Sequence, residues 1–207
     1  MNNNQTRIGV MALQGAFIEH MHVLQRLGVR ATEVRQRTEL EGLEGLIIPG
    51  GESTTILKLM HLYDIYQPLK GMIEAGFPVM GVCAGMICLA QKVTNTQESS
   101  LEPLRVMDIE VRRNAFGRQV DSFEADLIIP ALGEKPYHAV FIRAPLIDNV
   151  GPGIDILARL PDGNAVAARQ GGILVTSFHP ELTDDTRFHE YFVRIINSKK
   201  REGEIKA

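Results

Sequence analysis

Cys83 lies between Gly81 and Gly85 in the segment GVCAG, at the point where an apolar strand is expected to run directly into a helix. Small flanking residues allow the backbone to turn sharply there. The pattern G-x-C-x-G has the form of a nucleophile elbow, in which the side chain is exposed above the sheet. A helix start favours the thiolate, and the amide of Ala84 would face an oxyanion on a bound carbonyl. The alternative is a small buried cysteine, which is the role expected for Cys88.

A nucleophilic thiol needs a base that takes its proton and returns one to the leaving group. His179 follows the apolar strand GILVTSF, and Pro180 favours an extended backbone at this histidine. Glu181 can accept a hydrogen bond from the other ring nitrogen of His179, which fixes the tautomer. Cys83, His179 and Glu181 are therefore a candidate triad. The remaining histidines are expected to be surface or boundary residues: His20, His22, His61, His138 and His189.

The segment PGGES also follows an apolar strand, GLIIP. Its two glycines expose backbone N–H groups, so Gly51 is the candidate for a second oxyanion donor. The alternative is a Gly-Gly turn before a helix that Ser53 or Thr54 caps. A phosphate loop is excluded because no G-K-[ST] follows the glycines.

These residues require a sheet whose strands end at the same edge, and the first half of the chain predicts one. Short apolar runs alternate with stretches of helical periodicity, which is typical of a doubly wound, mostly parallel α/β sheet with helices on both faces. Strands are expected over 7–13, 29–34, 45–49 and 77–82, with helices after the first, third and fourth, the last over 84–92. In such sheets, ligands bind beyond the carboxyl ends of the strands.

The second half predicts an additional antiparallel region. Short strand-like segments alternate with turns rich in Gly, Pro, Asp and Asn, with little helical signal between them. The expected strands are 104–112, 122–129, 138–143, 154–160 and 164–169, followed by a buried strand over 172–178 and a helix over 185–197. We expect a single domain over residues 1–207, since no repeat or low-complexity linker interrupts the chain.

Composition restricts the partners. The 207 residues are 44% hydrophobic and 23% charged, with a net charge of −3, so neither nucleic acid nor an anionic membrane is expected as the main partner. The polar start MNNNQT does not have the pattern of a signal peptide, and no apolar run is long enough to span a membrane. Two cysteines alone cannot form a zinc site, and a reducing cytoplasm is the expected location.

Five motifs together resemble a known family. PGGEST, GVCAG, RNAFGRQVDSFEADL, FIRAP and SFHPEL follow one another as they do in class I (triad) glutamine amidotransferases. Within that class, the chain is similar to the glutaminase subunits of pyridoxal 5'-phosphate synthases. Two departures are Val82 and Ala115, where Thr and Ser are usual, and they concern substrate contacts or the surroundings of the thiol.

The resemblance implies hydrolysis of L-glutamine to L-glutamate and ammonia. Cys83 would be the nucleophile, His179 the base and acid, and Glu181 the orienting residue, with oxyanion amides from Gly51 and Ala84. The implied glutamine pocket consists of Gly51, Glu52, Ser53, Arg113, Ile142 and Arg143. Arg113 suits a carboxylate, although a solvated surface charge is the alternative.

The resemblance also implies a partner and no cofactor or metal on this chain. Ammonia would enter a barrel-shaped synthase subunit in a large hetero-oligomer, which makes pyridoxal 5'-phosphate as its product. Two alternatives stay open: a glutaminase that serves another synthase, such as imidazole glycerol phosphate synthase, and a non-catalytic binding or regulatory module of the same fold.

Overall fold

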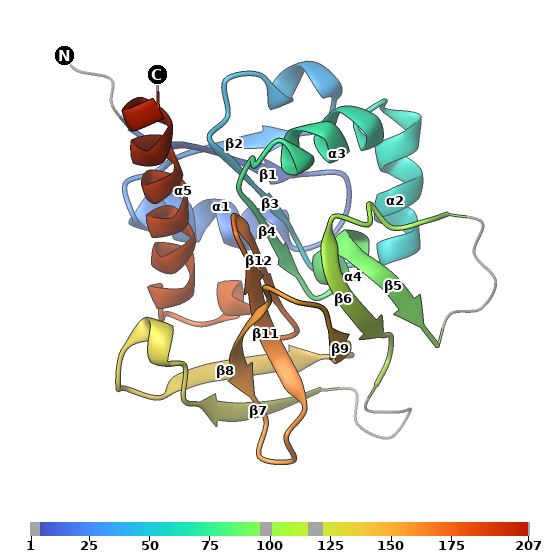
Figure 1. Cartoon of the computed structure of the whole chain (residues 1–207), viewed down its shortest axis with the longest axis vertical. Helices are drawn as coiled ribbons and strands as arrows, with labels where there is room; N and C mark the ends of the chain where they lie inside the picture. Colours follow the sequence, from blue (N-terminus) through green and yellow to red (C-terminus); the bar gives the residue numbers. More distant parts are fainter. Residues whose placement is uncertain (1–4, 96–100, 116–121, 207) are drawn as a thin grey trace.

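The computed structural model describes residues 5–95, 101–115 and 122–206. Residues 1–4 of the polar amino-terminal segment and residues 116–121 of the RNAFGRQVDSFEADL motif lie outside the described residues. Figure 1 shows one large sheet between two groups of helices, with a two-stranded ribbon below it.

Five neighbouring strands of this sheet are parallel, in the order β2-β1-β3-β4-β12. They are β1 (Arg7–Met11), β2 (Arg30–Val34), β3 (Gly45–Ile48), β4 (Val79–Val82) and β12 (Ile173–Thr176). The helices are α1 (Phe17–Arg26), α2 (Ser53–Leu62), α3 (Tyr66–Glu74), α4 (Ala84–Leu89) and α5 (Arg187–Lys206). The doubly wound architecture expected from the alternating pattern is thus confirmed.

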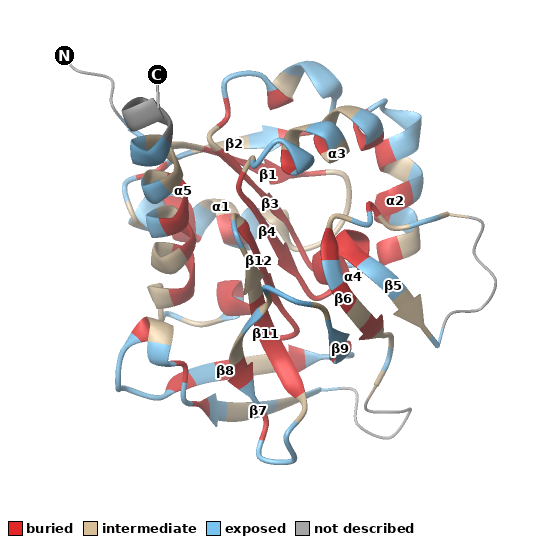
Figure 2. Cartoon of the chain, in the orientation of Figure 1, coloured by how far each residue is buried: buried red, intermediate tan, exposed pale blue. Residues whose placement is uncertain are grey.

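The central strands are buried on both faces, as Figure 2 shows by their red colour. Successive side chains point to opposite faces, so the strands divide between two cores. On one face, Leu46 and Ile48 of β3 belong to the same core as α2 and α3 residues. On the other face, Ile47 belongs to the core that contains α1 and α5 residues. This two-sided burial explains the continuous apolar runs in the sequence.

The second half of the chain supplies the antiparallel strands. Beyond β12 the sheet continues through β11, β9, β6 and β5, with β10 paired to β11. A separate ribbon pairs β7 with β8. The bounds are β5 (Ala90–Thr94), β6 (Met107–Arg112), β7 (Ser122–Leu127), β8 (Tyr137–Ile142), β9 (Leu146–Val150), β10 (Asp155–Arg159) and β11 (Ala165–Gln170). The predicted antiparallel region is confirmed, although β5 and β6 pair in parallel.

Two local predictions were wrong. The helix expected over 84–92 ends at Leu89, and the chain continues as β5 because it pairs with β6. The cap of α2 is Glu52 rather than Ser53 or Thr54, since its carboxylate accepts hydrogen bonds from the backbone N–H groups of Thr54 and Thr55. Helix α3 and strand β9 were not predicted.

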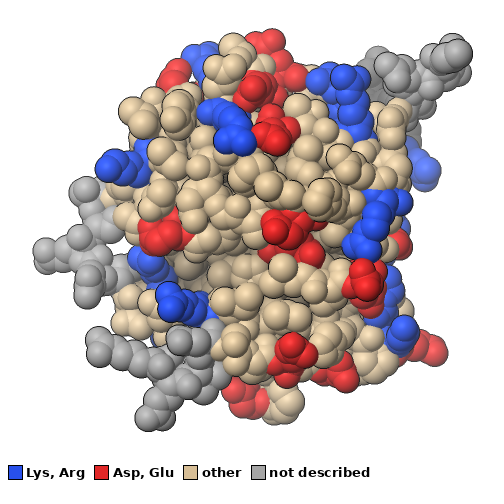
Figure 3. All heavy atoms as spheres, turned by 180° about the vertical axis from the view of Figure 1, so that it is seen from behind, with Lys and Arg blue, Asp and Glu red and all other residues tan. Residues whose placement is uncertain are grey.

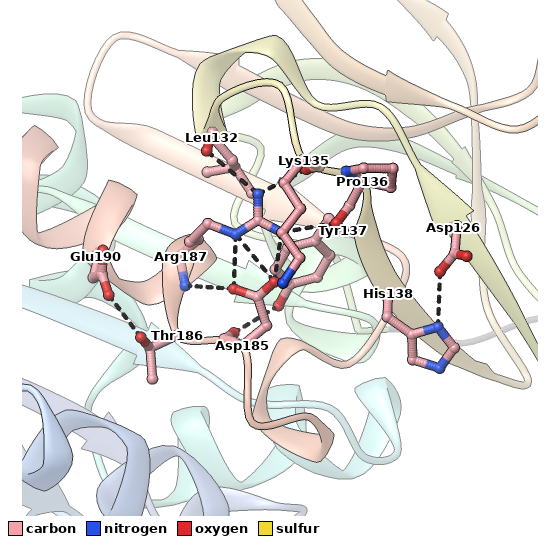
Figure 4. A network of polar contacts seen from close by, with 10 residues as sticks. All are labelled: Asp126, Leu132, Lys135, Pro136, Tyr137, His138, Asp185, Thr186, Arg187 and Glu190. Atoms are coloured by element: carbon pink, nitrogen blue, oxygen red, sulfur yellow. Dashed lines mark hydrogen bonds and ion pairs between the residues drawn. The ribbon is translucent and has the colours of Figure 1, made fainter.

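Arg187, at the start of α5, connects this helix to the loop between β7 and β8 (Figure 4). Its guanidinium donates hydrogen bonds to the backbone carbonyls of Lys135 and Pro136 at 2.8 and 2.9 Å, and to the Asp185 carboxylate at 2.6 Å. It also lies over the ring of Tyr137, 5.5 Å from the centroid. The ribbon that leads to Ile142 is therefore fixed at its far end.

The surface carries both signs of charge. On the face in Figure 3, Lys and Arg side chains are interspersed with Asp and Glu, and uncharged residues separate them. Among the residues that the structure describes, no helix combines the length and apolar character needed to cross a membrane.

Candidate active site

Cys83 occupies the turn between β4 and α4 in a strained conformation. Its φ of 50° and ψ of −102° are unusual for a residue with a side chain. The N–H of Cys83 donates a 2.7 Å hydrogen bond to the carbonyl of Thr176 in β12. A Cβ at Gly85 would collide with the carbonyl of Ile48, so the tight turn requires glycine there. The elbow expected from GVCAG is present.

His179 and Glu181 follow the neighbouring strand, β12. The short helix η3 (Pro180–Leu182) begins directly after His179. This turn brings the Glu181 carboxylate within 2.7 Å of the histidine Nδ1, which donates to it. Both residues are buried, and the N–H of His179 is bonded to the Val140 carbonyl of β8 at 2.8 Å. The ring of His179 therefore has a fixed orientation.

Cys83 and His179 meet because β4 and β12 are adjacent parallel strands. Burial alone would lower the pKa of His179. Hydrogen bonds with Cys83 and Glu181, together with their charges, outweigh burial and raise the pKa to about 10. The imidazolium thus lies between a sulfur and a carboxylate. This is the arrangement needed to transfer a proton to a leaving group.

Glu181 keeps its charge although it is buried. Desolvation by burial would raise its pKa, but the hydrogen bond from His179 and the charge of that ring lower it, with the His20 ring on the other side of the carboxylate. The pKa of Glu181 is consequently lowered. A carboxylate at this position stabilises the positive ring of His179.

The PGGES loop lies against the base. A Cβ at Gly50 would collide with the imidazole of His179, so the loop backbone and the ring are in direct contact. Gln14 holds the loop, since its Oε1 accepts a 2.7 Å hydrogen bond from the N–H of Glu52. The structure therefore brings the loop backbone at Gly50 against His179, and Gly51 is the next residue along the loop. Ala84 is the first residue of α4, where amide groups have no partner within the helix.

Arg113 and Glu52 form an ion pair at the same edge of the sheet. The guanidinium Nη2 of Arg113 lies 2.9 Å from Glu52 Oε1. Burial alone would raise the pKa of Glu52, but hydrogen bonds from the helix start lower it. Ser53 follows in the first turn of α2 and is buried. Arg113 is therefore paired rather than solvated, and its partner is another residue of the predicted pocket.

Ile142 and Arg143 reach the site from the ribbon. The carbonyl oxygen of Ile142 lies 3.9 Å from Cys83 Sγ. Arg143 follows with a positive φ of 46° and an exposed side chain. The carbonyl of Ala144 accepts a 3.4 Å hydrogen bond from the N–H of Ala115, which connects this turn to the Arg113 segment. The ribbon turn and the Arg113 segment are thus connected, and the Ile142 carbonyl lies beside the cysteine.

Two other histidines near the site were misjudged from the sequence. His20 of α1 and His189 of α5 were expected at the surface or boundary, but both are fully buried. His20 falls on the same helical face as Phe17, Met21 and Leu24, and that periodicity was the available signal. In the described part of the chain, no group of three His, Cys, Asp or Glu side chains is placed to hold a metal ion.

Comparisons with known proteins agree with this geometry. The model of the SNO glutamine amidotransferase family matches residues 10–198. A protein from Dehalococcoides mccartyi, named pyridoxal 5'-phosphate synthase subunit PdxT, is 55% identical over 194 residues, covering 94% of this chain and 99% of its own. One of the same name from Herpetosiphon aurantiacus is 56% identical over 186 residues, covering 90% and 98%.

A solved structure leads to the same family. The crystal structure of a glutamine amidotransferase is similar with a TM-score of 0.86 at 48% identity, and the match covers 92% of this chain and 98% of that one. Since the family model spans most of the sequence and the relatives align over nearly their full length, this chain belongs to the SNO glutamine amidotransferase family.

Proposed function

We propose that this chain hydrolyses the side-chain amide of L-glutamine to L-glutamate and ammonia. Cys83 is the nucleophile, His179 the general base and acid, and Glu181 the residue that orients the base. One observation carries the proposal: the elbow cysteine ends the strand next to the one that leads to His179, and the Nδ1 of this histidine donates to a buried carboxylate 2.7 Å away. Family membership narrows the reaction to glutamine amide chemistry.

The reaction proceeds in two steps. The Cys83 sulfur forms a bond to the amide carbon of glutamine, and the backbone N–H groups of Gly51 and Ala84 stabilise the oxyanion. The C–N bond then breaks as His179 gives its proton to the departing nitrogen, which leaves as ammonia. Water, deprotonated by His179, attacks the thioester and releases glutamate and the free cysteine.

The pocket residues bind the α-amino acid end of glutamine. Glu52, with its carboxylate, is suited to the α-ammonium group, and Arg113 and Arg143 are suited to the α-carboxylate. Ser53 and Ile142 complete the walls around the substrate. The Glu52–Arg113 ion pair, at 2.9 Å, exchanges part of its contact for these groups when glutamine enters.

Ammonia released here is passed to a synthase subunit. The relatives are named subunits of pyridoxal 5'-phosphate synthase, and we extend that assembly to this chain. The partner is a barrel-shaped subunit in a large hetero-oligomer, located in the cytoplasm. Pyridoxal 5'-phosphate is the product of that complex, so this chain itself uses no cofactor.

The test is glutamine-dependent ammonia release by the chain co-purified with its synthase subunit. Cys83→Ala is expected to lose at least about 10⁴-fold in rate, because the nucleophile acts as part of a unit with its base. Glu181→Gln is expected to lose roughly 10²- to 10⁴-fold while remaining folded. Cys88→Ala is the matched control, since that thiol is buried and contacts the Ser53 carbonyl, at 3.9 Å, rather than His179.

The same assay decides between the alternatives. Ammonia release that persists in Cys83→Ala would refute this nucleophile, and a normal rate in Glu181→Gln would refute the orienting role. Activation by the synthase subunit of imidazole glycerol phosphate synthase instead would assign another product. A complex that forms without any ammonia release would identify a non-catalytic module.

A further inference from the structure

A chain of buried imidazoles continues behind Glu181. His20 and His189 come from α1 and α5, which lie on the same side of the sheet in Figure 1, and neither ring is exposed. His20 Nδ1 lies 2.9 Å from His189 Nε2, and His20 Nε2 lies 3.5 Å from Glu181 Oε2. Since His179 bonds the other oxygen of Glu181, the carboxylate has an imidazole on each side.

The donors and acceptors around His20 favour one tautomer for His20 and one for His189. A neutral imidazole has one N–H donor and one acceptor nitrogen. If His20 carried its proton on Nδ1, its Nε2 lone pair would face the anionic oxygen of Glu181 without a proton between them. The opposite tautomer directs an N–H toward the carboxylate and lets His20 Nδ1 accept from His189 Nε2. Neither His20 Nε2 nor Glu181 Oε2 has a hydrogen-bond partner among the described residues.

The two rings are neutral. Burial lowers the pKa of His20, against the opposing charge of Glu181, and burial lowers the pKa of His189 well below its usual value. A neutral donor satisfies a buried carboxylate without cancelling its charge. The charged and titratable groups that face these rings are Glu181, His179 and Glu19 for His20, and His20 and Arg26 for His189.

The geometry points to His20 as a positioning residue of the triad: in its Nε2–H tautomer, set by His189, it holds Glu181 so that the full carboxylate charge faces His179. This inference rests on the proposed function. Without His20, Oε2 would lose the ring nitrogen that faces it at 3.5 Å, which favours rotation or protonation of the buried carboxylate. Either change would weaken the stabilisation of the imidazolium on His179.

A pair of substitutions separates this role from mere packing. Gln carries an N–H donor at a position comparable to Nε2, whereas Leu fills similar space without a donor. In the complex, His20→Leu is expected to lower kcat for glutamine about 10- to 100-fold with little change in KM, the loss for one hydrogen bond to a charged group. His20→Gln is expected to recover kcat to within about threefold of the unmodified chain. The exposed His22 of the same helix provides the control, His22→Gln, with unchanged kcat.

Equal impairment of the Gln and Leu variants would overturn the proposal, as would a folded Leu variant with the original kcat. A Leu variant that does not fold leaves the Gln variant as the decisive measurement. In that case a kcat more than tenfold below that of the unmodified chain contradicts the role.

A second measurement needs neither substrate nor partner. NMR spectra of the chain labelled with ¹⁵N-histidine report which ring nitrogen is protonated. We expect Nε2–H and neutral rings for both His20 and His189 at pH 7. A proton on Nδ1 of His20, or a charged His20 ring, overturns the inference even if the chain is an active glutaminase. Conversely, the expected tautomers in a chain without ammonia release would refute the proposed function alone.

Discussion

At the scale of single residues, the site depends on one strained backbone. Cys83 has φ and ψ values that an L-residue adopts at a cost of about 1–3 kcal/mol. A short hydrogen bond to Thr176 and close packing around Gly85 hold it there. The strain places the sulfur at the end of the sheet, beside the base on the next strand. A relaxed turn would direct the side chain elsewhere.

A substitution at Gly50 tests how closely the ring of His179 is held. A Cβ at this position would collide with the His179 ring, so Gly50→Ala is expected to displace the imidazole. A displacement of about 1 Å costs about 100-fold in rate. Overpacking would also destabilise the fold by about 1–3 kcal/mol. Ammonia release and urea unfolding of the variant measure the two effects separately.

Gly71→Ala is the matched control for that substitution. Gly71 lies in α3 with open space around the added methyl group. The change should leave ammonia release unaltered and stabilise the chain by about 0.5–1 kcal/mol, because alanine favours the helix. If Gly50→Ala retained full activity, the close contact with His179 would have no functional importance.

The residue types of the triad were predictable, but their environment was not. GVCAG and SFHPE predicted an elbow and an imidazole–carboxylate pair, because both patterns are local in the sequence. The burial of His20 and His189 depends on contacts across 169 positions of the chain, which local patterns do not contain. The same reasoning applies to Arg113, whose ion pair with Glu52 joins segments 61 residues apart.

At the scale of elements, strong periodicity predicted whether a segment is a helix or a strand. It predicted where that segment ends less precisely. The parallel strands were predicted because continuous apolar runs reflect burial on both faces. Helix α4 was expected to reach residue 92, but pairing with β6 from Ala90 onward overrides helical preference. Strand β9 was missed because only Leu146 and Ile147 are buried, whereas Asp148 and Asn149 are polar and exposed. Long-range pairing, rather than local propensity, decides such segments.

The hydrogen bonds of Arg187 should determine how stably the β7–β8 ribbon is attached to α5. Arg187→Ala removes several charge-assisted hydrogen bonds and leaves two backbone carbonyls without this donor, while the Asp185 carboxylate keeps the backbone N–H of residue 187. We expect a loss of about 2–4 kcal/mol in the free energy of unfolding, measured by urea denaturation at pH 7. Since the ribbon carries Ile142, ammonia release should fall as well. Exposed Arg194 is the control, and Arg194→Ala should change stability by less than about 0.5 kcal/mol.

This stabilisation depends on pH with a defined sign. The hydrogen bond from Arg187, against a smaller effect of burial, lowers the pKa of Asp185. A carboxyl group with a depressed pKa stabilises the fold above its unfolded pKa of about 4, and the contribution disappears as the pH falls below that value. The difference between the unmodified chain and Arg187→Ala should therefore shrink from pH 7 to pH 3. A difference independent of pH would show that Asp185 has no part in it.

At the scale of the whole molecule, the site forms where two kinds of sheet meet. The parallel half supplies Cys83 and His179 at strand ends, and the antiparallel half brings the Ile142 carbonyl within 3.9 Å of the Cys83 sulfur and pairs Arg113 with Glu52. The sequence predicted both halves separately. Their junction, with β12 paired to β4 on one side and to β11 on the other, required the three-dimensional structure.

The two cysteines differ in how much of the molecule must open before they react. Cys83 is 7% exposed at the active site, whereas Cys88 is 0% exposed within the main core. Burial also raises the pKa of the Cys88 thiol, so its thiolate is scarce. We expect iodoacetamide to label one cysteine of the folded chain quickly, and mass spectrometry of peptides should identify it as Cys83.

Cys88 should be labelled only through global unfolding, because it belongs to the core that α2, α3 and the sheet share. Its labelling rate should therefore rise with urea in parallel with the unfolding equilibrium, whereas labelling of Cys83 should not. Cys83→Ala is the control, in which the fast phase disappears and the slow phase remains. If Cys88 reacted as fast as Cys83 without denaturant, α4 would open locally. In that case α4 could not be the rigid support on which the strained cysteine depends.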